Sequence, residues 1–80
     1  MSALAEKKME ISPDELIKIQ AYLRSKFDND GLAVRPRSQT KDSIEVLLNG
    51  EFIGVVYKDE DEGETSYDFN MAILDIDLPE

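Results

Sequence analysis

The chain of 80 residues contains no cysteine, no histidine and no tryptophan. Without cysteine there is neither a disulfide framework nor a thiolate metal site. Without histidine the usual general base and the imidazole metal ligand are both missing. These absences argue against an enzyme, and we expect no cofactor. The lack of cysteine also suits a reducing cytoplasm, where disulfides are rare.

Long apolar runs are absent as well. No run reaches the ~18 residues of a membrane-spanning helix, and the N-terminus lacks the apolar core of a signal peptide. We therefore expect a soluble, cytoplasmic protein with no membrane partner. Hydrophobic residues make up 41% of the chain, which is too apolar for a disordered protein despite 34% charged residues. The length predicts a single domain, over residues 11–80, and the mixed charge and missing helix caps of residues 1–10 predict a flexible tail there.

Positive charge is scarce and unevenly placed. Residues 1–41 hold 8 Lys/Arg and 6 Asp/Glu, whereas residues 42–80 hold 1 Lys and 12 Asp/Glu, and the net charge of the chain is −9. A protein this acidic is repelled by nucleic acid. Three basic residues lie close in sequence and form a candidate basic patch: Arg35, Arg37 and Lys41. Their pairing with the acidic half of the same molecule is the favoured interpretation.

One helix is predicted after residue 12. Ser12 is the expected N-cap, Pro13 takes the first helical position, and Glu15 completes a capping box. Residues 28–31 end the helix with turn chemistry, and Gly31 is expected to take the left-handed conformation. The apolar face of the helix comprises Leu16, Ile19, Leu23 and Phe27.

Alternating apolar residues predict strands after the helix. Asn49-Gly50 is typical of a type I′ hairpin turn. A two-residue loop sets the expected register of the hairpin: Leu48 opposite Glu51, Leu47 opposite Phe52, Val46 opposite Ile53, and Ile44 opposite Val55. In the last strand the alternation changes phase at Leu74, which predicts a bulge, or a strand end followed by a docked tail, near residues 73–75.

These elements predict an α+β fold with two layers, in which one N-terminal helix packs on a four-stranded antiparallel meander sheet of order 1-2-3-4. The helix is expected to cover the face that bears Val46, Val55, Phe69 and Met71.

The other face of this sheet would present an apolar patch, which makes it a candidate interface. Its predicted members are Leu47, Phe52, Val56, Ala72 and Leu74. We predict that the protein forms a homodimer, or binds a protein partner, through this face. The alternative is that the N-terminal tail or residues 75–80 fold over it.

Residues 59–64 form an acidic run that could bind a divalent cation. The run departs from the EF-hand pattern, because Gly63 stands at the fifth loop position and Asn70 replaces the bidentate Glu. A solubilising turn is the favoured interpretation; a domain that responds to a small ligand or a divalent cation is the alternative function. Asp75 and Asp77 are spaced as a possible catalytic pair, but such alternation is more typical of the solvated side of an edge strand.

Several segments together resemble a family of small bacterial proteins known as domain of unknown function 3126. The resemblance rests on FIGVVYKDEDEGE at residues 52–64, SYDFNMAILDIDL at 66–78, QAYLR at 20–24 and VRPR at 34–37. It covers roughly residues 13–78 and implies no catalytic residue, cofactor or substrate. The leading hypothesis is therefore a non-enzymatic interaction module, acting as a homodimer or as an adaptor for a basic protein partner.

Overall fold

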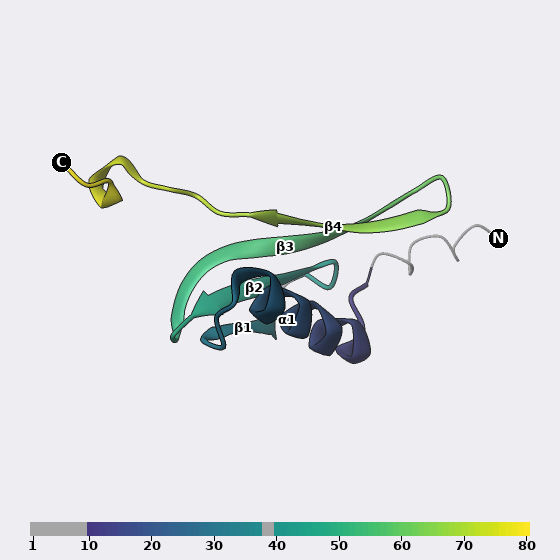
Figure 1. The fold of residues 1–80 in the computed structure, drawn as a ribbon. Coiled ribbons are helices and arrows are strands. Elements are labelled where there is room, and N and C mark those ends of the chain that lie inside the picture. Colours follow the sequence, from purple (N-terminus) through teal and green to yellow (C-terminus); the bar gives the residue numbers. More distant parts are fainter. Residues whose placement is uncertain (1–9, 38–39) are drawn as a thin grey trace.

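The computed structural model describes residues 10–37 and 40–80, so the predicted tail lies outside the described residues except for Glu10. The described elements run in the order α1 (Pro13–Phe27), β1 (Leu32–Pro36), β2 (Ser43–Leu48), β3 (Glu51–Asp61), β4 (Glu64–Asn70) and the 3-10 turn η2 (Asp75–Asp77). The strands form an antiparallel sheet of order β1-β2-β3-β4, and α1 packs against it (Figure 1). The predicted fold class and strand order are confirmed.

The predicted capping box at the start of α1 is present. The Ser12 hydroxyl accepts a hydrogen bond from the Glu15 N–H at 3.1 Å, and the Ser12 N–H donates to Glu15 Oε1 at 2.8 Å. At the other end Asp28, with φ of 53°, takes the left-handed conformation expected of Gly31. Its N–H bonds to the carbonyls of the last helical turn. Asp is among the few residues that adopt this conformation at low cost, so the prediction for Gly31 was wrong.

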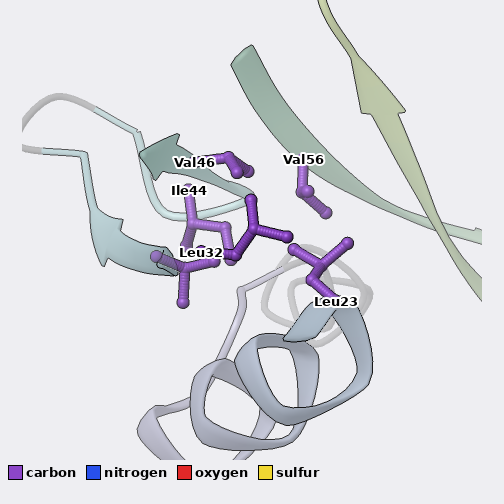
Figure 2. Close-up of a cluster of buried hydrophobic side chains, with 6 residues drawn as sticks. Leu23, Leu32, Ile44, Val46 and Val56 are labelled. Carbon is purple, nitrogen blue, oxygen red and sulfur yellow. The ribbon is translucent and has the colours of Figure 1, made fainter. Parts of the chain in front are cut away.

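The core is small and lies between α1 and the inner face of β1, β2 and β3. Figure 2 shows side chains from all four elements converging on one cluster. Its buried members are Leu23, Leu32, Val34, Ile44, Val46 and Val56.

The β2–β3 hairpin contains a β-bulge that the sequence pattern did not reveal. Its turn is as predicted, with positive φ at both Asn49 and Gly50. The pairs Leu48–Glu51 and Leu47–Phe52 are confirmed, but Val46 pairs with Gly54 and Ile44 with Val56. Ile53 is therefore an extra residue on β3, and the predicted pairs Val46–Ile53 and Ile44–Val55 were wrong.

From Gly54 onwards this bulge exchanges the two faces of β3. Val56 lies in the core and is 2% exposed, so its predicted place on the outer face was wrong. Val55 takes the outer face instead, because a slip of one residue reverses every side chain of a strand. Phe69 pairs with Val56 and packs against the core as expected. Met71 lies beyond the end of β4 and is exposed.

The sheet is staggered, and the molecule is elongated, with extents of 55 × 25 × 25 Å. β3 pairs with β2 from Glu51 to Tyr57, but with β4 only from Val55 to Asp61. The hairpin of β3 and β4 therefore projects beyond β2 at one end. At the other end the chain after Asn70 leaves the sheet (Figure 1).

Candidate interaction surface

The last residues of the chain form an exposed apolar segment, residues 71–78, which we call the C-terminal arm. β4 ends at Asn70, and the arm continues as extended chain into η2. Figure 1 shows it running away from the helix and the sheet. A strand end followed by a docked tail was one of the two predicted outcomes; the strand ends earlier than predicted, and the tail is not docked, because every residue from 71 to 80 is exposed.

The arm carries five large apolar side chains that are each 52% to 85% exposed. They comprise Met71, Ile73, Leu74, Ile76 and Leu78. Their spacing explains why the arm is not a continuation of β4: residues 71 and 73 alternate in one phase and residues 74, 76 and 78 in the other. A regular strand presents only one of these sets to the core.

The arm, through Met71, Ala72, Leu74 and Asp77, and the start of β3 line a hollow of about 720 Å³, which we call the outer hollow. Phe52 and Tyr57 on the β3 side are themselves partly exposed. The wall of the outer hollow is mainly apolar and includes Phe52, Val55, Tyr57, Met71, Ala72 and Leu74.

Three of the five predicted interface residues therefore meet at one place: Phe52, Ala72 and Leu74 line the outer hollow. Leu47 pairs with Phe52 but is buried, and Val56 belongs to the core. The proposed cover by residues 75–80 is not formed, because these residues are exposed. The alternative cover, the N-terminal tail, lies outside the described residues.

Close packing fixes the point at which β3 and β4 separate. A Cβ atom on Gly54 would lie 2.5 Å from the Asn70 carbonyl oxygen and 2.7 Å from the Phe69 ring. Only glycine permits this approach of the two strands. Beyond it β3 bends at the bulge while the chain of β4 runs on, and the outer hollow lies between them.

The outer edge of β1 is covered by two side chains of α1. Gln20 Oε1 accepts a hydrogen bond from the Val34 N–H at 3.0 Å, and Arg24 Nε donates to the Leu32 carbonyl at 2.7 Å. Gln20 lies within the apolar face of the helix, between Leu16 and Leu23 in the chain, where a polar residue is unexpected. The structure supplies the reason, since both side chains satisfy backbone groups that would otherwise be free to pair with another strand.

The predicted basic patch is partly dispersed. Arg35 forms an ion pair with Glu45 at 2.7 Å, which agrees with the interpretation that the basic residues pair within the molecule. Arg37 donates to the Ser43 hydroxyl at 3.2 Å. Arg37 and Lys41 both line a hollow of about 840 Å³ beside the start of α1, whereas Arg35 does not.

A polar cluster ties the start of α1 to the projecting hairpin. Lys58 Nζ lies 2.8 Å from Glu15 Oε2, and the Tyr67 hydroxyl donates to the same oxygen. Lys58 Nζ also donates to the Glu10 carbonyl at 3.0 Å. The side chain of Lys58 is only 9% exposed, so its charge depends on these partners.

The cluster shifts two pKa values. Partial burial of Glu15 favours its neutral form, but hydrogen bonds from Lys58, the Ser12 N–H and Tyr67, with the charge of Lys58, outweigh it and lower the pKa of Glu15 from 4.5 to about 2. The hydrogen bond to Glu15, followed by burial and nearby negative charge, raises the pKa of Tyr67 from 10.0 to about 12. Each shift favours the protonation state in which the cluster is intact.

We expect these shifts to appear as pH-dependent stability. A folded-state pKa lowered to about 2 gives Glu15 a stabilising contribution above pH 4.5 that disappears as the pH falls to about 2. A pKa raised to about 12 gives Tyr67 a contribution that is complete below pH 10.0 and disappears as the pH rises to about 12. Urea unfolding across both ranges should show a weaker acid dependence for Glu15→Gln and a weaker alkaline dependence for Tyr67→Phe than for wild type. Unchanged slopes in these variants would show that the cluster does not form.

The acidic run at residues 59–64 closes the hairpin of β3 and β4. Glu62 and Gly63 both have positive φ, and every residue of the run is exposed. In the described part of the chain, no three Asp or Glu side chains are grouped so that they could hold a metal ion. Among the described helices, none is long and apolar enough to cross a membrane.

Comparison with known families identifies the family of the chain. A sequence model for the family described as protein of unknown function (DUF3126) matches residues 15–77. The chain belongs to this family. No curated protein and no solved structure matches the chain. The DUF3126 match begins in α1, spans the sheet and includes most of the arm, so the arm is part of the family's domain and not an appendage to it.

Proposed function

We propose that this chain is a non-enzymatic protein–protein interaction module that contacts its partner through the C-terminal arm and the outer hollow. The observation that carries the proposal is the exposure of the five large apolar side chains of the arm. Single exposed apolar residues are common on soluble proteins, but a contiguous group is typical of a contact surface.

Burial of the arm by a partner would contribute a large free energy for a protein of this size. Full burial of a large apolar side chain stabilises a protein by about 1.5–3 kcal/mol. Each of the five in the arm is more than half exposed, so a partner that covered them would gain roughly 1 kcal/mol from each, or about 5 kcal/mol together. An 80-residue domain is stable by only about 4–12 kcal/mol in total. Burial of the arm is therefore a large term for a molecule of this size.

The acidic hairpin supports the proposal from the opposite end of the molecule. Its carboxylates are exposed, and they keep the β3–β4 tip from pairing with other strands. The same charge would attract a basic partner and repel an acidic one, and both effects weaken with salt. The hairpin thus influences association, while the arm supplies the contact area.

The proposal is tested by affinity capture from extracts of the source cells. Tagged wild type, Leu74→Asp and the control Ile17→Asp are compared at low and high salt, and retained proteins are identified by mass spectrometry, with untagged copies of the chain counted among them. Ile17 is 63% exposed on α1 and does not line the outer hollow, so it matches Leu74 in exposure but not in place. We expect wild type and Ile17→Asp to retain a common partner that Leu74→Asp loses by at least about tenfold, equivalent to 1.4 kcal/mol. Retention of the same proteins by all three, or of none, would contradict the proposal.

A further inference from the structure

We infer that the partner is a second copy of this chain, and that two copies exchange their arms, each arm pairing along the residue 51–54 edge of β3 in the other copy. This inference rests on the proposed function, and it names the partner and the site of contact. It follows from a mismatch between the two ladders of β3.

The β4 side of β3 is only partly used. β3 pairs with β2 from Glu51 onwards, but its ladder with β4 begins at Val55. In the described part of the chain, no strand pairs with the remaining edge at residues 51–54. Unpaired strand edges recruit other strands. Past Glu51 this edge carries no charge that would discourage pairing.

The arm is the segment that would complete this ladder. Carried on from the pair Val55–Asn70, the β3–β4 register places Gly54 opposite Met71 and Phe52 opposite Ile73. The described part of each chain therefore carries both a free edge and an extended segment that fits it in register. A surface that is complementary to itself is what a two-fold symmetric dimer requires, and exchange of an identical segment is a low-cost route to one.

Within one chain the same pairing is not made. The bulge at Ile53 bends β3, and the outer hollow of about 720 Å³ separates β3 from the arm. Ile73 and Ile76, the most exposed of the five large apolar side chains of the arm at 66% and 85%, do not line the hollow of their own chain. In a second copy the register above sets Ile73 opposite Phe52, which lines the outer hollow, and Ile76 continues just beyond the residue 51–54 edge.

The other strand edges offer a poorer fit. The outer edge of β1 is already satisfied by Gln20 and Arg24. The outer edge of β4 carries Glu64 and Asp68 beside the acidic run, so two such edges would repel each other. Among the strands that the structure describes, the residue 51–54 edge is the one that combines unpaired backbone groups with an apolar neighbourhood.

The net charge of the chain means that the effect of salt on association distinguishes a second copy from a basic partner. Each copy carries −9, so two copies repel each other, and the apolar contact must overcome that repulsion. Salt screens this repulsion, and the exchanged dimer is expected to tighten as ionic strength rises. Association with a basic partner has the opposite dependence.

The test uses cysteine cross-linking in the full-length chain, which has no cysteine of its own. Phe52→Cys and Ile73→Cys are made in separate chains, mixed and oxidised. Residues directly opposite in an antiparallel ladder have Cα atoms about 4.5–5.5 Å apart, within the range of a disulfide. The control replaces Ile73→Cys by Tyr22→Cys, since Tyr22 is 60% exposed on α1 and outside the hollow.

We expect the mixed disulfide between positions 52 and 73 to form at least ten times faster than that between positions 52 and 22. Wild type and Ile17→Asp should sediment at twice the chain mass of 9.1 kDa, more so at high salt, whereas Ile76→Asp should sediment at 9.1 kDa. A wild type that sediments at 9.1 kDa at every concentration and salt would overturn the inference. So would a disulfide between positions 52 and 73 that forms in a double variant with both cysteines in one chain but not between the two single variants. If these results came with arm-dependent capture of another protein, the second copy would be wrong and the proposed function would stand; without such capture both would fail.

Discussion

Val56→Asp should leave the protein largely unfolded, whereas Val55→Asp should leave it folded. Val56 is 2% exposed and lies among Leu23, Ile44 and Val46, where a carboxylate would have no polar partner. Burial of an unpaired charge is among the few single changes that cost more than about 4 kcal/mol. That loss is comparable with the whole stability of about 4–12 kcal/mol expected for 80 residues.

Val55 is the matched control for this prediction. It is the adjacent residue with the same side chain, but it faces the outer hollow and is only partly buried. We expect Val55→Asp to cost about 1 kcal/mol, in the range of an ordinary substitution. Far-ultraviolet circular dichroism and urea unfolding measure both variants. If Val55→Asp unfolded the protein and Val56→Asp were tolerated, the β2–β3 register would be the regular one and the bulge at Ile53 would be wrong.

Glu15→Ala should cost roughly 2–3 kcal/mol, the second largest effect that we expect. The change removes the partner of Lys58, whose side chain is 9% exposed, and also the acceptor of the Tyr67 hydroxyl and one half of the capping box. Breaking a fully buried ion pair costs about 3–5 kcal/mol, and the value here is lower because the Glu15 side chain is 24% exposed.

Asp14→Ala provides the control for Glu15→Ala in the same helical turn. Asp14 pairs with Lys18 at 3.6 Å, but both side chains are more than three-quarters exposed. An exposed pair of this kind contributes about 0.3–0.5 kcal/mol. Urea unfolding at neutral pH should therefore separate the two variants clearly. Equal losses for Asp14→Ala and Glu15→Ala would show that the cluster with Lys58 is not formed.

Local patterns predicted most of the fold. The start of α1 follows from Ser12, Pro13 and Glu15, and the β2–β3 turn from Asn49-Gly50, because in each case the deciding residues are neighbours in the chain. The order of the strands followed from short connections. These features are determined by geometry over a few residues, and the structure reproduces them.

The bulge at Ile53 could not be predicted from local sequence patterns. β3 has apolar side chains at four of the positions from 52 to 56, so both alternations leave a plausible apolar face. The choice between Val55 and Val56 for the core depends on packing against Leu23 and Ile44, which lie far away in sequence. A pattern with no polar residue to mark the outer face does not fix the register.

Only part of the candidate site was predicted, because its other features also depend on contacts between residues that are distant in sequence. Phe52, Ala72 and Leu74 were expected to share a surface, and they do line the outer hollow together. Whether residues 75–80 cover this surface was left open, because an alternating apolar segment has the same sequence pattern whether it docks on its own domain or extends from it. The cluster of Glu15, Lys58 and Tyr67 was missed, since its members are brought together only by the tertiary fold.

The central claim is that the apolar side chains of the arm make their contacts outside their own domain. Urea unfolding of wild type and Ile76→Asp, measured over a wide range of protein concentration, tests it most directly. We predict that the two have the same unfolding midpoint at the lowest concentration, and that only the wild-type midpoint rises with concentration, because association stabilises the folded state. A midpoint that is lower for Ile76→Asp at every concentration, by the 2 kcal/mol or more typical of a buried apolar side chain, would show that the arm packs on its own domain and would contradict the account.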